Sequence, residues 1–197
     1  MTLPKNLLWG DFIFYGDQDL LSFALLYSGG LAVPAMFHAS QVIEKYLKAL
    51  ALSTVADADD PRSCEDFPWL KTMDLGYLAQ KCATKFPFYI HQDTLNLVYR
   101  YARFDKVARF PWHEKRYGSG FTVEDQPVFF ELVSRLRRDI NIPVDDFPLG
   151  LLVRGFPQNS PKAIIHRPIA DLQRIALATL RKTFRKVDEM VRWEKTK

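Results

Sequence analysis

The stretch VPAMFHASQVIEKYLKALALS, residues 33–53, is the most informative part of this chain for its fold class. Wound at 3.6 residues per turn, it gathers its apolar side chains on one face. These are Ala35, Ala39, Val42, Ile43, Tyr46, Leu47 and Leu50. The other side carries His38, Gln41, Glu44, Lys45 and Lys48. Pro34 is tolerated because a proline in the first turn removes no helical hydrogen bond. The pattern therefore predicts an amphipathic helix with one buried face.

Segments on both sides of this stretch also have helical patterns. Residues 17–28 begin with aspartates suited to a helix start and run into Gly29-Gly30, which suits a helix stop. Further helices are predicted over residues 69–86, 92–108, 120–140 and 169–193. The inward stripe of 92–108 consists of Leu95, Val98, Tyr101 and Ala102, and that of 169–193 of Ile175, Leu180, Phe184, Val187 and Val191. No strand pattern competes with these helices.

The order of the predicted helices indicates an all-α fold. Residues 1–140 are expected to form a bundle of about five helices. Residues 141–168 carry five prolines and are predicted to be an irregular connection. Residues 141–197 as a whole then add this connection and a basic C-terminal helix that packs on the bundle.

Composition limits the class of protein. The chain has 197 residues, of which 48% are hydrophobic and 25% charged, as is typical of a globular domain with a real core. No apolar run approaches the roughly 18–20 residues of a membrane span, and no signal peptide is recognised. Cys64 and Cys82 have no metal-like spacing, which favours reduced thiols and a cytoplasmic protein.

The positive charge lies mainly in the C-terminal helix region. Residues 162–197 hold ten Lys/Arg against four Asp/Glu, whereas the first 161 residues hold 17 against 19. Such a tail is suited to an acidic partner, including nucleic acid. The alternative is a solvated helix face without a partner.

Three pieces of the sequence resemble one family. AMFHASQVIEKYLKALAL (35–52) has Phe-His, a polar stretch and Glu-Lys-x-Leu-Lys-Ala, like the second helix of HEPN (higher eukaryotes and prokaryotes nucleotide-binding) domains. LKTMDLGYLA (70–79) resembles the family's Lys-Thr-His-Asp-Leu segment, with Met73 at the usual histidine. ARFPW (108–112) is similar to the Arg-aromatic-Pro end of the next helix. Order and spacing also fit, over roughly residues 17–140.

The resemblance implies an up-and-down bundle of four or five helices that is commonly a homodimer. Many members of the family work beside a minimal nucleotidyltransferase in toxin–antitoxin pairs, and others are RNases. In the RNase branch, an Arg and a His separated by four to six residues lie at a dimer cleft and cut RNA without metal.

Arg109 and His113 are the candidate catalytic residues for such a reaction. Histidine is able to move the protons of the 2′-hydroxyl and the leaving oxygen, and arginine to stabilise charge on the phosphate. Here only three residues separate the two, one fewer than in the family motif. Pro111 disfavours helical geometry at Phe110, so the helix is expected to end near Arg109. His113 then lies on a loop, and catalysis requires that loop to fold back.

A binding site places fewer demands on geometry. Arg103, Lys106 and Arg109 are spaced three apart and form a cationic strip at a helix end, where the dipole favours positive charge. A second stripe on residues 33–53 consists of His38, Gln41 and Lys45. In a bundle the two sets are able to flank one groove and hold a phosphate. The alternative is that the arginines pair with carboxylates or carbonyls and that His38 caps the core edge.

Aromatic residues interleave with these cations in an arrangement suited to base stacking, although aromatic residues at helical spacing more often belong to a core. They are Tyr99, Tyr101, Phe104, Phe110 and Trp112. His91 and His166 have no carboxylate or cysteine at ligand spacing, so no metal site is predicted, and no cofactor is expected.

The sequence thus leaves three hypotheses. The first is a HEPN-like nucleotide- or RNA-binding protein of a toxin–antitoxin-type or defence system, with a nucleotidyltransferase partner. The second is a metal-independent endoribonuclease using Arg109 and His113. The third is a helical adaptor whose C-terminal helix docks on another protein.

Overall fold

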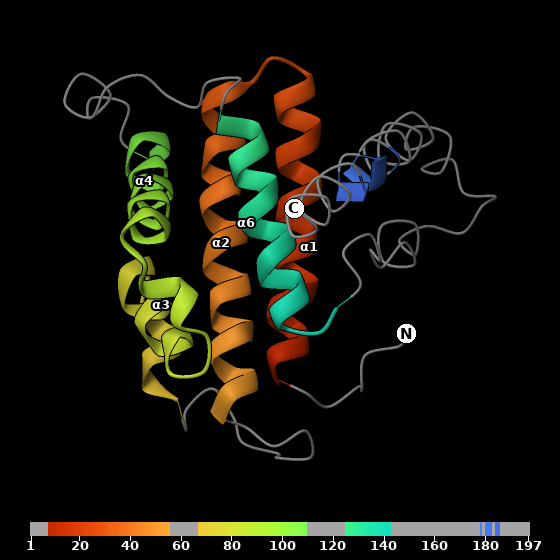
Figure 1. Ribbon diagram of the computed structural model, residues 1–197. Helices are drawn as coiled ribbons and strands as arrows, with labels where there is room; N and C mark the ends of the chain where they lie inside the picture. Colours follow the sequence, from red (N-terminus) through yellow and green to blue (C-terminus); the bar gives the residue numbers. More distant parts are fainter. Residues whose placement is uncertain are drawn as a thin grey trace, which may run out of the picture.

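The computed structural model describes residues 8–55, 67–109 and 125–142, together with 178, 180–182, 184 and 185. Every element in these ranges is helical, which confirms the predicted all-α class. The longer helices are α1 (Leu8–Ser28), α2 (Ala32–Val55), α3 (Leu75–Ala83), α4 (Gln92–Arg109) and α6 (Asp125–Asp139). Helices α1, α2, α4 and α6 alternate in direction along the bundle, and α2 lies between α1 and α4 (Figure 1).

The hairpin between α1 and α2 follows from its glycines. Gly30 has φ +76°, a left-handed conformation that favours glycine. The N–H of Gly30 donates to the carbonyl of Tyr27, and that of Leu31 to the carbonyl of Leu26. This pair of bonds is the Schellman motif, which satisfies the last carbonyls of a helix. The predicted helix stop at Gly29-Gly30 is therefore confirmed, but the start predicted at residue 17 is wrong, because α1 already includes Leu8.

Helix α2 forms the centre of the core. All seven residues of its predicted apolar face are buried. Phe23 of α1 packs against Phe129 of α6 at a ring-centroid distance of 4.6 Å, and Tyr101 of α4 lies 5.5 Å from the same Phe129 ring. Tyr101 and Val98 are buried as predicted for the inward stripe of α4. The core thus joins α1, α2, α4 and α6.

The prediction of a single helix over residues 69–86 is wrong. The chain instead forms a 3-10 helix, η2 (Pro68–Lys71), then α3, then a second 3-10 helix, η3 (Pro87–Ile90). Helix α3 begins only after Asp74, whose side chain accepts a hydrogen bond from the N–H of Tyr77. An aspartate in this position is a favourable N-cap, so it starts a new helix where apolar spacing alone predicts a continuous one.

Helix α6 ends as α1 does. Asn141 has φ 66°, and the N–H groups of Asn141 and Ile142 donate to the carbonyls of Arg138 and Arg137. The predicted end near Ile140 is confirmed. In the C-terminal segment, Phe184 is buried and lies 5.2 Å from the Phe130 ring of α6.

The remaining predictions for the C-terminal segment, those for Ile175, Val187 and Val191, lie outside the described residues. No helix in the described part of the chain is long and apolar enough to cross a membrane.

Candidate functional site

A buried polar network joins three helices in the bundle. Arg137 of α6 donates through Nη1 to Asp17 of α1 and, at 2.7 Å, to the hydroxyl of Tyr46 on α2. The Tyr46 hydroxyl in turn donates to Asp17. Burial strongly raises the pKa of Tyr46, and the adjacent Asp17 carboxylate adds to the rise while Arg137 opposes it. The phenol is therefore neutral and remains a donor.

This network has a structural role. The Arg137 side chain is 0% exposed and that of Asp17 only 5%. Burial lowers the pKa of Arg137, but Tyr46 and Asp17 more than offset this, so the guanidinium stays charged. Because solvent does not reach these groups, we assign the network to the fixed packing of α1, α2 and α6 rather than to ligand binding.

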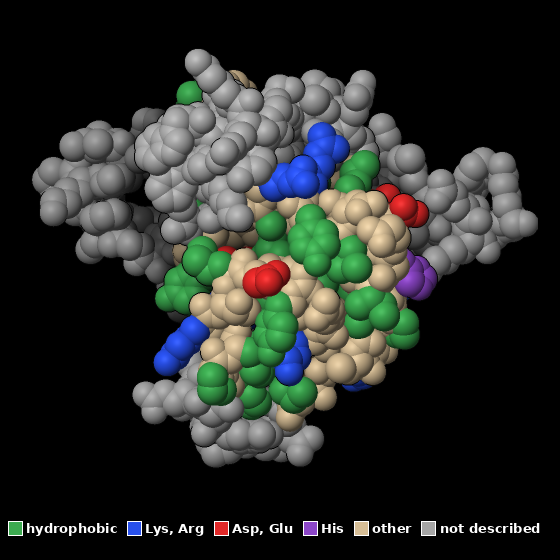
Figure 2. All heavy atoms as spheres, turned by 90° about the vertical axis from the view of Figure 1, so that its left-hand side faces the viewer, with side chains coloured by type: hydrophobic (Ala, Val, Ile, Leu, Met, Phe, Trp, Pro, Cys, Tyr) green, Lys and Arg blue, Asp and Glu red, His purple; other side chains and the backbone are tan. Residues whose placement is uncertain are grey.

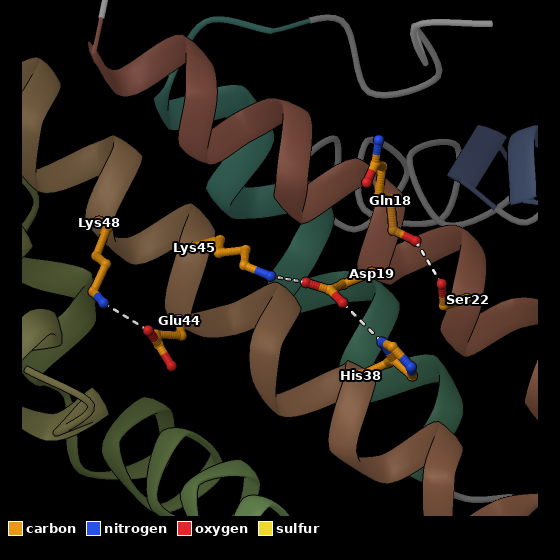
Figure 3. Close-up of polar contacts among 7 residues, drawn as sticks. All are labelled: Gln18, Asp19, Ser22, His38, Glu44, Lys45 and Lys48. Carbon is orange, nitrogen blue, oxygen red and sulfur yellow. Dashed lines mark hydrogen bonds and ion pairs between the residues drawn. The ribbon is translucent and has the colours of Figure 1, made fainter. Parts of the chain in front are cut away.

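A second polar cluster lies at the outer seam between α1 and α2 (Figure 3). The Asp19 carboxylate accepts a hydrogen bond from His38 Nδ1 at 2.7 Å and a charged hydrogen bond from Lys45 Nζ. The side chains of His38 and Lys45 remain 26% and 24% exposed. Because a carboxylate only accepts hydrogen bonds, the proton of neutral His38 lies on Nδ1.

The geometry of this cluster limits what it binds. Two of the three residues predicted for a phosphate stripe, His38 and Lys45, turn toward Asp19, which is not part of the predicted stripe. The carboxylate balances the charge of Lys45, so the cluster offers an anion little net attraction. Gln41 lies between them on α2 and is half-buried. The cluster faces α1, whereas α4 packs on the other side of α2 (Figure 1).

An ion pair within α2, between Lys48 and Glu44, is more buried than the sequence pattern predicts. Lys48 Nζ lies 2.6 Å from the Glu44 carboxylate, one turn away, and 5.9 Å from the centroid of the Phe12 ring. The sequence pattern predicts both residues on the polar side of α2, yet both are buried. Because this cation is satisfied within the bundle, it too contributes little to binding.

Several accessible cations lie on or beside α3 and α4. Arg103 is exposed on α4, one turn after Tyr99, so the two side chains share a face of the helix. On α3, Lys81 Nζ lies 5.5 Å from the centroid of the Tyr77 ring. We call the surface formed by Met73, Tyr77, Lys81, Tyr99 and Arg103 the α3–α4 surface. Apolar, cationic and some acidic side chains intermingle on this face of the molecule (Figure 2).

The local charge of this half is positive. Residues 67–109 contain seven Lys/Arg against three Asp/Glu, an excess of four, whereas residues 1–66 contain four against nine. Lys71, Lys85 and Arg103 are exposed. The half of the bundle that carries the α3–α4 surface is thus the one suited to a polyanion.

The structure separates the aromatic residues that were predicted to interleave with cations. Tyr101 is buried in the core, while Tyr99 is 44% exposed. The side chain of Phe104, and Phe110 and Trp112 altogether, lie outside the described residues. Among the aromatic residues of this set whose side chains the structure describes, Tyr99 is therefore the one accessible to a nucleic-acid base.

The candidate catalytic pair lies at the edge of the described residues. Helix α4 ends at Arg109, as Pro111 predicts. The side chains of Lys106 and Arg109 and the whole of His113 fall outside the described part of the chain. Within the described ranges, no group of three or more His, Cys, Asp or Glu side chains is arranged to hold a metal ion.

Comparison of the chain with protein-family models, curated proteins and solved structures finds no match.

Proposed function

We propose that this protein is a HEPN-like nucleotide- or RNA-binding protein that contacts phosphates with the exposed cations of α3 and α4. The observation that carries the proposal is the excess of four positive charges in residues 67–109. Exposed Lys and Arg side chains attract a polyanion through charge alone, without requiring a deep pocket. Arg103, predicted for ligand binding, belongs to this surface.

The same proposal includes the features that rest on the resemblance alone. These are a homodimer and a nucleotidyltransferase partner in a toxin–antitoxin-type or defence system. Support for them is the resemblance of 35–52, 70–79 and 108–112 to the family pattern. In this structure, two of those segments have clear local roles, since 35–52 forms the buried core helix and Asp74 caps α3.

Salt dependence is the decisive test. The affinity for a labelled single-stranded RNA is measured by fluorescence anisotropy at several salt concentrations. Contacts to four phosphates predict a slope of log K against log salt of about −3, because each contact to single strands contributes about −0.7. The Arg103→Ala variant is expected to lower this slope by about 0.7. Absence of salt-dependent binding refutes the proposal and favours a protein-binding adaptor.

The control variant is Lys182→Ala, which removes an exposed cation from the C-terminal segment. Its slope is expected to equal that of the wild type if the contacts lie on α3 and α4. Equal losses in Arg103→Ala and Lys182→Ala contradict that location and indicate diffuse attraction.

The endoribonuclease hypothesis is tested in the same samples. The RNA is incubated with protein in EDTA and its length followed on a gel. If His113 acts as acid or base, His113→Ala reduces cleavage about 10²–10⁴-fold, and Arg109→Ala also reduces it. Intact RNA with salt-dependent binding supports a protein that binds without cutting.

A further inference from the structure

The ring of Tyr99 reaches from α4 onto α3. A Cβ atom added at Gly76 of α3 would lie only 2.6 Å from the Tyr99 Cε1 and hydroxyl oxygen and 2.8 Å from its Cζ. No side chain larger than hydrogen fits there while the ring keeps its place. The absence of a side chain at Gly76 therefore allows the outer end of Tyr99 to rest directly on the α3 backbone.

The Tyr99 ring lies against α3 at Gly76, yet it remains accessible to solvent. The residue is 44% exposed, and the next residue after Gly76, Tyr77, is 39% exposed. Met73, just before α3, is also exposed. A ring that rests on a helix backbone loses less conformational entropy on binding than a free side chain. The two tyrosines thus offer accessible aromatic surface at the α3–α4 contact.

Cations accompany both rings. Lys81 lies against the Tyr77 ring, and Arg103 follows Tyr99 by one helical turn on the same face. An aromatic surface flanked by cations is the arrangement with which proteins bind single-stranded nucleic acid: rings stack on bases while cations contact the phosphates. The interior of a protein–protein interface is also rich in tyrosine, methionine and arginine but is depleted in lysine, so Lys81 is the residue of this surface that favours nucleic acid over a protein partner.

We propose that Tyr99, resting on Gly76, is a stacking platform for an unpaired base, with Tyr77 beside it and Arg103 and Lys81 contacting phosphates. The ligand of the α3–α4 surface is then single-stranded nucleic acid. A duplex is a poor ligand, because its bases are already stacked on one another and offer no free face to a surface ring. This inference rests on the proposed function and adds the class of nucleic acid.

The test compares one labelled RNA of about 12 nucleotides, free and annealed to its complement, by fluorescence anisotropy. Stacking contributes about 1–3 kcal/mol per base, so Tyr99→Leu is expected to weaken single-strand binding about 5- to 150-fold. Tyr99→Phe keeps the ring and is expected to bind like the wild type. Neither change is expected to alter binding of the duplex.

A second variant displaces the ring without removing it. In Gly76→Ala the new methyl group pushes the end of Tyr99 outward, and this exposed side chain is free to swing into solvent. Alanine also favours the helix relative to glycine by up to about 1 kcal/mol. Single-strand affinity is therefore expected to fall while the melting temperature is maintained, which separates loss of the platform from loss of the fold.

Tyr15→Leu is the matched control, since Tyr15 is 53% exposed on α1, outside the α3–α4 surface. Its affinity is expected to equal that of the wild type. The inference is overturned if Tyr99→Leu binds the single strand normally, or loses single strand and duplex alike. It is also overturned if Tyr99→Leu turns a dimer into a monomer in size-exclusion chromatography, because the ring is then a protein contact. If the wild type binds no RNA, the proposed function itself fails.

Discussion

Replacement of Arg137 by methionine is expected to be one of the most destabilising single changes in this protein. The substitution removes the cationic partner of the buried Asp17 carboxylate, to which the Tyr46 hydroxyl also donates. Removing one partner of a buried ion pair costs about 3–5 kcal/mol, because the other charge stays without compensation. Such a loss is a large part of the roughly 5–15 kcal/mol by which domains are typically stable.

Urea unfolding at pH 7, followed by circular dichroism, measures this effect. With a slope of about 2 kcal/mol per molar urea, the unfolding midpoint is expected to fall by about 1.5–2.5 M. The control is Arg135→Met on the same helix. Arg135 is partly exposed, 3.4 Å from Asp139 and 4.2 Å from the Phe88 ring centroid. Its replacement is expected to cost only about 1 kcal/mol, as for other accessible ion pairs and cation–π contacts.

A double variant tests the coupling directly. Asp17→Leu combined with Arg137→Met removes both charges and leaves apolar side chains, which buried sites often tolerate. The double variant is expected to lose much less stability than the sum of the two single variants. If the losses simply add, or if Arg137→Met costs no more than Arg135→Met, the charge-pairing explanation is refuted.

Three further predictions concern buried groups of the core. In Gly16→Ala the new Cβ would lie 3.0 Å from the Tyr46 ring, which the buried network holds in place. Differential scanning calorimetry is therefore expected to show a destabilisation of about 1–3 kcal/mol. An unchanged melting temperature contradicts this expected crowding. Burial raises the pKa of the Cys82 thiol to about 12. In a Cys64→Ser variant, where Cys82 is the remaining cysteine, iodoacetamide at pH 8 is expected to label the folded protein at least about a hundredfold more slowly than the protein unfolded in urea. Equal labelling rates contradict the burial of Cys82. Burial also raises the pKa values of Tyr46 and Tyr89, so above about pH 9–10 the unfolded chain releases protons that the folded chain keeps. Each of the two tyrosines then lowers the free energy of unfolding by about 1.4 kcal/mol per pH unit. A urea unfolding midpoint that stays constant up to about pH 10.5 contradicts this pH dependence.

The apolar face of α2 was predictable because burial repeats with the helical period. The same pattern places Glu44 and Lys48 on the solvent side, where it is wrong. Helix α2 has neighbours on several sides, and Phe12 of α1 lies near Lys48. A periodic pattern reports the polarity of a helix face but not how many other helices surround it.

The error over residues 69–86 had a local signal. Asp74 is a good N-cap residue, and Pro87 disfavours helix at Phe86. In the structure Thr72 Oγ1 also accepts a hydrogen bond from the N–H of Asp74, which shapes the turn before α3. Apolar spacing favours one continuous helix over this segment, but the capping residues determine where the helix begins and ends.

The polar contacts of the bundle had no comparable signal. Asp17 and Arg137 are separated by 120 residues, and Asp19 and Lys45 by 26. The residue types are visible in the sequence, but the register with which α1 and α6 pack on α2 is not. Arg103 was predictable because helical spacing along α4 is local, whereas the role of Tyr99 depends on Gly76 in another helix.

The distribution of paired charges explains why the α3–α4 surface, rather than the α2 stripe, is the better anion site. Residues 1–66 contain nine Asp/Glu, but Asp17, Asp19 and Glu44 each have a cationic partner inside the bundle. Close pairing cancels their fields over short distances, and salt screens the remainder beyond about 10 Å. In residues 67–109 the Lys and Arg residues exceed the Asp and Glu residues by four, and Lys71, Lys85 and Arg103 are among the exposed cations. Anion binding is therefore expected to follow the exposed cations of α3 and α4, and not the net charge of the chain.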